Sequence, residues 1–304
     1  MDYNAILTRI YNESKDLAKQ GKVATYIPAL AQISPEKYGL SLITTKNEQY
    51  NIGDFDLPFS IQSISKVFTF SLVYSKLGHE IWNRIGKEPS GTAFNSLIQL
   101  EHEHGIPRNP FINAGAIVVA DILLSLFPDP KKVLLEFICE LANDYNIKYN
   151  EKVAISEKEY GHRNYALAHF MKSFGNIHHP VEDVLDIYFH QCSIEMSTEK
   201  LAKSMLFLAN DGIVPHSDKQ IITRSQAKRL KAMMLTTGLY NESGEFAFRV
   251  GMPAKSGVGG GIIAVIPNVL TIATWSPPLN NMGNSIAGID AMERLTTYTG
   301  QSIF

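Results

Sequence analysis

The sequence predicts an α+β fold in which an antiparallel sheet of about five strands is flanked by helices. Strand-like runs lie near the N-terminus, over 38–45 and 48–52. They return only after Ala254, and the long section between them has helical periodicity. A sheet built from both chain ends, with a large helical insertion, is the compact arrangement that fits this order.

The first part of the chain contains one predicted helix and the first two strands. The helix covers about Tyr3 to Lys19, is amphipathic with charges throughout, and closes at Gly21. The segment after it is expected to be extended, with Pro28 as a breaker. Residues 45–47 suit a short hairpin turn between the two strands.

The segment from Phe59 to Gly78 is expected to form a mostly buried helix, with Gly78 as its left-handed end. Ser63 falls near the N-terminus, and Lys66 lies on the same face, so its amine can reach the serine hydroxyl. A buried lysine has a lowered pKa and can act as a base toward serine. The alternative is that Ser63 caps the helix and Lys66 lies on the surface, which spacing alone favours.

The long middle section is expected to be helical and to carry no strands. A capping box of Thr223 and Gln226 precedes its last helix, which Gly238 ends. The predicted helices cover about 94–102, 114–127, 130–145, 164–174, 181–191, 198–210 and 225–237.

The last part of the chain returns to strands and closes with a helix. Residues 261–266 and 269–275 are β-rich runs separated by a Pro-Asn pair, which indicates a hairpin. A helix over about 285–297 follows. We expect one domain over 1–304, with a sheet part over about 1–62 and 240–304 and a helical part over about 63–239.

Composition excludes several classes of function. The chain has 304 residues, 45% of them apolar, and a net charge of −2, which offers nucleic acid or an anionic membrane no attraction. The longest apolar run, 114–127, is too short to span a bilayer. Cys139 and Cys192 lie in apolar patterns typical of buried thiols. No signal peptide is visible, so we expect a cytoplasmic protein.

Three apparent motifs carry little weight. The Glu-His-Glu-His run over 101–104 lacks the H-E-x-x-H spacing of a zinc site, and His178-His179 precedes a proline at a helix start. The glycine-rich run over 257–261 leads into a strand, not into a phosphate-binding helix. It fits a close backbone approach to a substrate, or a tight turn. We therefore expect no metal and no cofactor.

A second motif supports the catalytic interpretation of Ser63. Lys255-Ser256-Gly257 enters a late strand, and S-x-x-K followed by such a K-S-G strand resembles the serine β-lactamases and penicillin-binding proteins. The strand offers an edge on which a substrate can lie. An amide there, together with the amide of Ser63, can stabilise a tetrahedral oxyanion.

A closer resemblance covers nearly the whole chain, which is identified as a member of the serine-dependent glutaminase family, with its β-lactamase-like fold. Seven ordered stretches carry it: 21–31, 59–68, 109–117, 156–168, 184–196, 236–262 and the tail from Asn281. The resemblance implies hydrolysis of L-glutamine through a glutamyl-enzyme intermediate. It also implies a homodimer or homotetramer.

The resemblance assigns a role to each site residue. It implies that Ser63 is the nucleophile, Lys66 its base, and Tyr240 a proton relay. Val258 would supply its backbone amide to the oxyanion. The positions that match substrate contacts are Tyr26, Ser63, Asn113, Glu157, Asn164, Tyr188, Tyr240 and Val258.

The residue types suit a free amino acid as substrate. Glu157 can pair with its ammonium, and Asn113 and Asn164 can bond its α-carboxylate or α-amine. Tyr188 and Tyr26 supply flat walls with polar tips, and the segment around Tyr26 is expected to act as a lid. Taken singly, Asn164 could instead be a helix N-cap, Glu157 a helix-start residue, and the tyrosines core residues.

Two other functions stay open at this point. One is a β-lactamase-like or peptidase-like amide hydrolase. The other is a catalytically idle ligand-binding protein on the same scaffold, against which the intact set of Ser63, Lys66 and Tyr240 argues.

Overall fold

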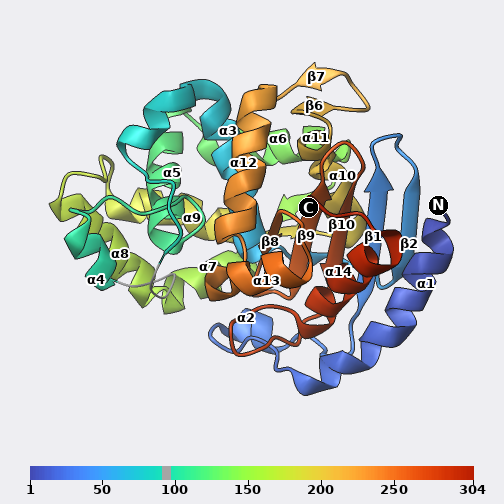
Figure 1. The fold of residues 1–304 in the computed structure, drawn as a ribbon. Helices are drawn as coiled ribbons and strands as arrows, with labels where there is room; N and C mark the ends of the chain where they lie inside the picture. The colour runs from blue at the N-terminus through green and yellow to red at the C-terminus, as the bar shows by residue number, and fades with distance from the viewer. Residues whose placement is uncertain (91–96) are drawn as a thin grey trace.

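The computed structural model describes residues 1–90 and 97–304, and it contains a five-stranded antiparallel sheet that lies beside a large helical part (Figure 1). The strand order is β2-β1-β10-β9-β8. The strands are β1 (Gly39–Thr44), β2 (Gln49–Gly53), β8 (Ala254–Ser256), β9 (Gly261–Ile266) and β10 (Leu270–Trp275). Strands from the two chain ends pair directly, because β1 runs antiparallel to β10 along its whole length. The predicted fold class is confirmed.

The sheet is covered on both faces, which is why its central strands β1, β9 and β10 are buried at every residue. Side chains alternate along a strand, so Leu40 and Leu42 of β1 pack with α1 (Tyr3–Ser14) and α14 (Ile286–Thr299). Ile43, on the opposite face, joins the large core of the helical part. Hydrogen bonds tie that face to α10 (Thr198–Ser204), including Ser41 Oγ to Thr198 Oγ1 at 2.8 Å.

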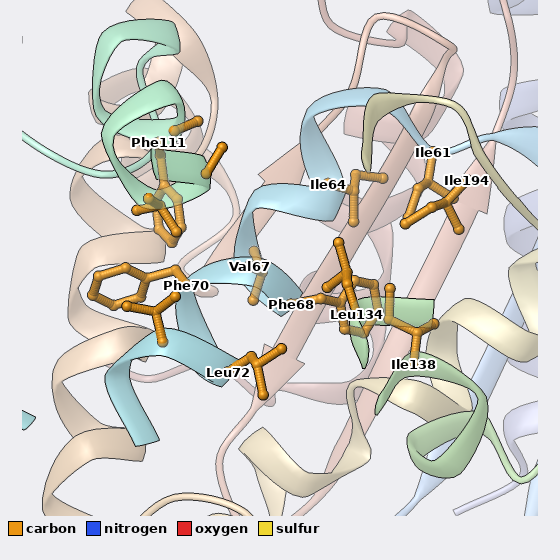
Figure 2. Close-up of a cluster of buried hydrophobic side chains, with 14 of the residues drawn as sticks. Ile61, Ile64, Val67, Phe68, Phe70, Leu72, Phe111, Leu134, Ile138 and Ile194 are labelled. Carbon is orange, nitrogen blue, oxygen red and sulfur yellow. The ribbon is translucent and has the colours of Figure 1, made fainter. Parts of the chain in front are cut away.

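The centre of the helical part is α3 (Ser65–Leu77), which is buried over most of its length because its apolar residues lie on all sides (Figure 2). Val67, Phe68 and Phe70 are fully buried and belong to the large core. Ser63 was expected near the N-terminus of this helix, but the α-helix begins two residues later, at Ser65. Ser63 lies instead in a 3₁₀ turn over Gln62–Ile64. Gly78 ends α3, as predicted, with a positive φ of 53°, but its ψ of −123° lies outside the left-handed helical region that was expected.

Most of the predicted middle helices are present within a few residues of their expected bounds. The helix predicted over 198–210 is two helices, and the beginning of the one predicted over 94–102 lies outside the described residues. The middle helices are α4 (Leu97–His102), α5 (Asn113–Leu126), α6 (Pro130–Ala142), α7 (Glu151–Tyr160), α8 (His162–Ser173), α9 (Val181–Cys192), α10, α11 (Leu206–Ala209) and α12 (Arg224–Thr237). Of these, α7 was not predicted, nor was α13 (Ser243–Arg249) after them.

Three local expectations need correction. Pro28 does not interrupt an extended segment but begins the short helix α2 (Pro28–Ala31), at the first helical position, where a missing N–H costs nothing. The first helix ends as an α-helix at Ser14 and continues as a 3₁₀ helix over Lys15–Gln20. The middle section also contains short strands: β4 (Lys148–Tyr149), β5 (Ile194–Met196), β6 (Ile213–Val214) and β7 (Lys219–Gln220).

Other local predictions are confirmed. Thr223 and Gln226 form the capping box at the start of α12. Cys139 and Cys192 are both buried and free. Among the described residues, no helix is long and apolar enough to cross a membrane.

Candidate active site

Ser63 lies in a turn whose position is set by the strand before it. β3 (Phe59–Ser60) pairs with β5, and Gln62 then adopts a positive φ of 49° that turns the chain into α3. Ser63 is 8% exposed at this point. Few non-glycine residues adopt such a φ, and they are often found at functional sites.

A glycine loop lies directly against the Ser63 turn. A Cβ at Gly257 would lie 2.4 Å from the Ile61 carbonyl oxygen and 3.3 Å from the Ser63 nitrogen. A Cβ at Gly259 would lie 2.4 Å from the Ser60 carbonyl oxygen. Only glycine fits at such distances, so this loop brings the Val258 backbone next to Ser63. The backbone of the glycine run thus lies close to the backbone of residues 60–63.

Lys66 lies beneath the turn and is 1% exposed. Its Nζ donates to Asn113 Oδ1 at 2.7 Å and to the Phe111 carbonyl oxygen at 3.3 Å. Burial lowers the pKa of this amine to about 8, although Cys192 and Glu157 act in the opposite direction. A substantial fraction of Lys66 is therefore neutral near pH 8, as a base requires. The alternative of a surface lysine is wrong.

Lys255 is a second fully buried lysine in the same region. Its Nζ donates to the Ser256 carbonyl oxygen at 2.7 Å and lies 4.7 Å from the centre of the Tyr240 ring. Burial, and then repulsion from Lys66, hold the pKa of Lys255 well below its ordinary value. The sequence pointed to Lys255 through the K-S-G triplet but assigned it no role of its own.

Tyr240 completes the group around Ser63. It begins a 3₁₀ turn (Tyr240–Glu242) between α12 and α13 and has a positive φ of 51°. Burial raises the pKa of its hydroxyl, and hydrogen bonding with Ser63 and with the Val258 backbone partly opposes that rise. The Tyr240 hydroxyl is therefore protonated near neutral pH and lies in contact with Ser63.

An acidic wall faces the serine from α7. Glu157 is 4% exposed and is the seventh residue of that helix, not a helix-start residue. Tyr26 donates from its hydroxyl to Glu157 Oε1 at 2.7 Å, and the hydroxyl also lies 3.0 Å from Gln62 Oε1. Burial raises the pKa of Glu157, while hydrogen bonds from Tyr26 and Gln62 and the charge of Lys66 lower it. The Glu157 side chain thus lies buried, and no cation among residues 1–90 and 97–304 is bonded directly to it.

Amide side chains form the adjoining wall. Asn113, the first residue of α5, donates from Nδ2 to Asn164 Oδ1 at 3.1 Å. Asn164 lies inside α8, whose N-cap is Gly161, so the N-cap alternative for Asn164 is wrong. Tyr188 of α9 is 3% exposed, and its ring lies 5.9 Å from Lys66 Nζ.

These residues line one cavity of about 520 Å³. All eight residues that the resemblance places against substrate line it, and Lys66 lies behind the wall that Asn113 forms. Sequence reasoning missed the other lining residues: Gln62, Tyr160, Gly161, His162, Arg163 and Cys192. Several of them are next to predicted site residues in the sequence, as Gln62 is to Ser63 and Arg163 is to Asn164. That proximity was the signal that could have indicated them.

Cys192 is the only cysteine among the described residues that line the cavity. Its environment disfavours attack by its thiol on a bound molecule. Burial raises the pKa of its thiol to about 12, so it stays protonated and unreactive near neutral pH. The arrangement places a buried amine, a phenol, two backbone amides and a buried carboxyl group around Ser63, which is the set of groups that an attack by this serine on a bound molecule would need.

Comparison with known proteins shows which family the chain resembles. The family model described as "Glutaminase" matches residues 21–304. A protein of Ralstonia nicotianae named "Glutaminase" is 51% identical over 304 residues and covers 100% of both chains. A protein of Aliarcobacter butzleri with the same name is 52% identical over 305 residues, again with 100% of both chains covered.

Solved structures give the same result. The Bacillus subtilis "Probable Glutaminase" has a TM-score of 0.91 at 33% identity, covering 100% of this chain and 98% of that one. A structure of the probable glutaminase from Bacillus subtilis complexed with 6-diazo-5-oxo-L-norleucine has a TM-score of 0.87 at 33% identity. It covers 97% of this chain and 94% of that one.

Proposed function

This chain belongs to the glutaminase family and hydrolyses L-glutamine to L-glutamate and ammonia, and we propose that it does so through a covalent glutamyl-Ser63 intermediate. One observation carries the proposal. Ser63 shares a cavity with Tyr240, Glu157 and the Val258 backbone, above a buried lysine whose pKa is about 8. That set supports acyl transfer to a serine.

In the first step, Lys66 accepts the Ser63 proton as Oγ attacks the side-chain carbonyl carbon of glutamine. The amides of Ser63 and Val258 donate to the oxyanion that forms on the carbonyl oxygen. The C–N bond then breaks, and the leaving nitrogen takes a proton through the Tyr240 hydroxyl. The products are ammonia and a glutamyl ester of Ser63.

The second step reverses the roles with water as the nucleophile. Lys66, through Tyr240, accepts a proton from a water that attacks the ester carbonyl. The tetrahedral intermediate collapses, Ser63 recovers its proton, and L-glutamate leaves. The buried lysine serves both steps because its pKa lets it both gain and lose a proton near neutral pH.

Glu157 is proposed to bind the ammonium of the substrate. Glu157 has no cation bonded to it among the described residues, so a cation that enters the cavity would stabilise its buried carboxylate. Tyr26 holds Glu157 in place from one side, and the segment that carries Tyr26 is proposed to close over the substrate. Asn113, Asn164 and Tyr188 are proposed to complete the contacts with the α-carbon substituents.

The covalent intermediate is tested by replacing the nucleophile and by trapping it. Ser63→Ala is expected to abolish ammonia release while leaving the melting temperature nearly unchanged, because the substitution removes only one hydroxyl. The glutamine-shaped electrophile 6-diazo-5-oxo-L-norleucine should add to Ser63, as peptide mass spectrometry would show. An adduct on Cys139 or Cys192, or substantial turnover by the variant, would contradict the mechanism.

Two further expectations, one from the resemblance and one from the lack of a visible signal peptide, stay predictions. A homodimer or homotetramer is tested by light scattering on the purified protein. A cytoplasmic location is tested by cell fractionation.

A further inference from the structure

A second cavity lies beside α12 and plays no part in the proposed reaction. The helix α12 crosses the front of the molecule in Figure 1. Its volume is about 690 Å³, larger than the 520 Å³ of the substrate cavity, and the two share no lining residue. Its walls come from α12, the segment before β8, the turn between β9 and β10, and the end of the chain. The lining residues are Asp211, Arg224, Ser225, Lys228, Lys231, Ala232, Leu235, Pro253, Pro267 and Ile303.

The charges in this cavity are mostly positive. Arg224, Lys228 and Lys231 lie on one face of α12, since they are four and then three residues apart. Asp211 is the only acidic residue among the described lining residues, and its Oδ2 pairs with Arg224 Nε at 3.1 Å. With that pair neutralised, two ammonium groups face the cavity. Like charges at this spacing repel each other, so the fold gains nothing from them.

Lys231 is the more informative of the two lysines. It is 8% exposed, yet its ammonium has no hydrogen bond or ion pair within the part of the chain that the structure describes. Burial lowers its pKa, and the attraction of Asp211 only partly opposes this. Burial of most of the side chain leaves this ammonium only partly hydrated, which costs free energy. An anion in the cavity would remove that cost.

The remaining walls define the rest of the ligand. Leu235, Pro253, Pro267 and Ile303 present apolar surface, and proline has no N–H to donate. We propose that this cavity binds a small amphipathic anion, with a carboxylate or phosphate head at Lys231 and Lys228 and an apolar body against Leu235 and the two prolines. This site is separate from the glutamine site and does not depend on the mechanism proposed there.

Calorimetric titration of the full chain tests the site with four probes. Octanoate and octyl phosphate carry both features, octan-1-ol lacks the charge, and inorganic phosphate lacks the apolar body. We expect one octanoate or octyl phosphate per chain, bound at least about tenfold more tightly than octan-1-ol, because the ammonium is desolvated. Lys231→Met, which keeps the length of the side chain, should weaken binding of both anions by about tenfold or more.

Two further variants make the result decisive. Lys132→Met removes a lysine whose side chain is 67% exposed and which lies outside this cavity, so it should leave binding unchanged. Ile303→Glu places a carboxylate in the wall at a position that is 37% exposed, so it should fold normally and repel the anions. Glutaminase activity reports that each variant is folded.

Three results would overturn the proposal. The first is that neither octanoate nor octyl phosphate binds the unmodified protein. The second is that Lys231→Met and Ile303→Glu bind them as tightly as the unmodified protein does, which would mean that Lys231 only packs its stem against the apolar wall. The third is that inorganic phosphate binds as tightly as octyl phosphate, which would exclude an amphipathic ligand.

Discussion

At the scale of single residues, the cavity is organised by charges that the fold has removed from water. Lys66 and Lys255 are both buried beside it, and Glu157 is buried opposite them. Each of the three has a pKa displaced toward its neutral form by burial. Displaced pKa values clustered in a cavity are typical of an active site.

The pKa of Lys66 predicts the pH dependence of the reaction. The neutral amine becomes available as pH rises through about 8, so kcat/KM should rise through that pH. Lys66→Arg keeps the charge but supplies no neutral base, so it should be nearly inactive at every pH. Initial rates measured at low substrate concentration across the pH range check both statements. A pH profile that is flat around pH 8 would exclude Lys66 as the base.

The same shift has a consequence for stability. The unfolded chain keeps the Lys66 proton up to its ordinary pKa of 10.5, while the folded chain loses it near 8. Between those values the unfolded state binds more protons, so the contribution of Lys66 to the free energy of unfolding rises with pH.

Glu157→Gln tests the ammonium site. The amide keeps the shape and can still accept from Tyr26, but it has no charge to pair with the substrate. We expect kcat/KM for glutamine to fall by an amount that corresponds to a loss of about 2–4 kcal/mol in transition-state stabilisation, because a desolvated charge pair is lost. The loss should be much smaller with 4-carbamoylbutanoate, which lacks the α-amino group. A comparison of both enzymes on both substrates measures the coupling, and a coupling near zero would place the ammonium elsewhere.

At the scale of elements, the site depends on how closely the glycine loop approaches the Ser63 turn. Gly257→Ala would place a Cβ 2.4 Å from the Ile61 carbonyl oxygen, so the loop or the turn must move. We expect kcat/KM to fall by about tenfold or more, because displacing Val258 would separate its amide from that of Ser63, the two donors proposed to bind the oxyanion. Steady-state kinetics would measure the loss.

A matched substitution controls for the general effect of adding a methyl group. A Cβ at Gly244, at the start of α13, meets nothing within 4 Å. Gly244→Ala should therefore keep full activity. Equal activity of the two variants would mean that the loop does not position the reacting groups.

At the scale of the whole molecule, the sheet part and the helical part share one core. Ile43, Ile263 and Val265 of the sheet pack in the same cluster as Val67 and Phe68 of α3. Thr271 Oγ1 donates to the Ala202 carbonyl oxygen at 2.8 Å, which ties β10 to α10. The division into two parts within one domain remains a prediction, and we expect the parts to unfold together.

The two tryptophans allow a direct test. Trp82→Phe leaves Trp275 of β10 as the only tryptophan, so fluorescence then reports the sheet. Far-UV circular dichroism reports mainly the helices of the same protein. The two urea unfolding curves should coincide, because a shared core makes unfolding cooperative. Two separate midpoints would show that the parts are independent units.

The sequence by itself determined the features that depend on short-range pattern. Period-2 and helical runs predicted the sheet from both chain ends and most of the helices, since side-chain spacing reflects local geometry. Glycines marked the end of α3 and the loop against Ser63 because backbone space is a local requirement. The helix α7 was missed because its charged sequence has little apolar periodicity, although Val153 and Ala154 are buried.

Only the tertiary structure decided which groups meet and what their chemistry becomes. Tyr26 and Glu157 are 131 residues apart in sequence and 2.7 Å apart in space, and no local pattern encodes such a contact. The resemblance named both residues, but not their hydrogen bond to each other. The lowered pKa of Lys66 follows from burial by α3, α5 and α9 together. The burial of Lys231, which has no bonded partner among the described residues, follows from the packing around α12. Desolvation is a property of all the surrounding chain, so it exists only once the chain has folded.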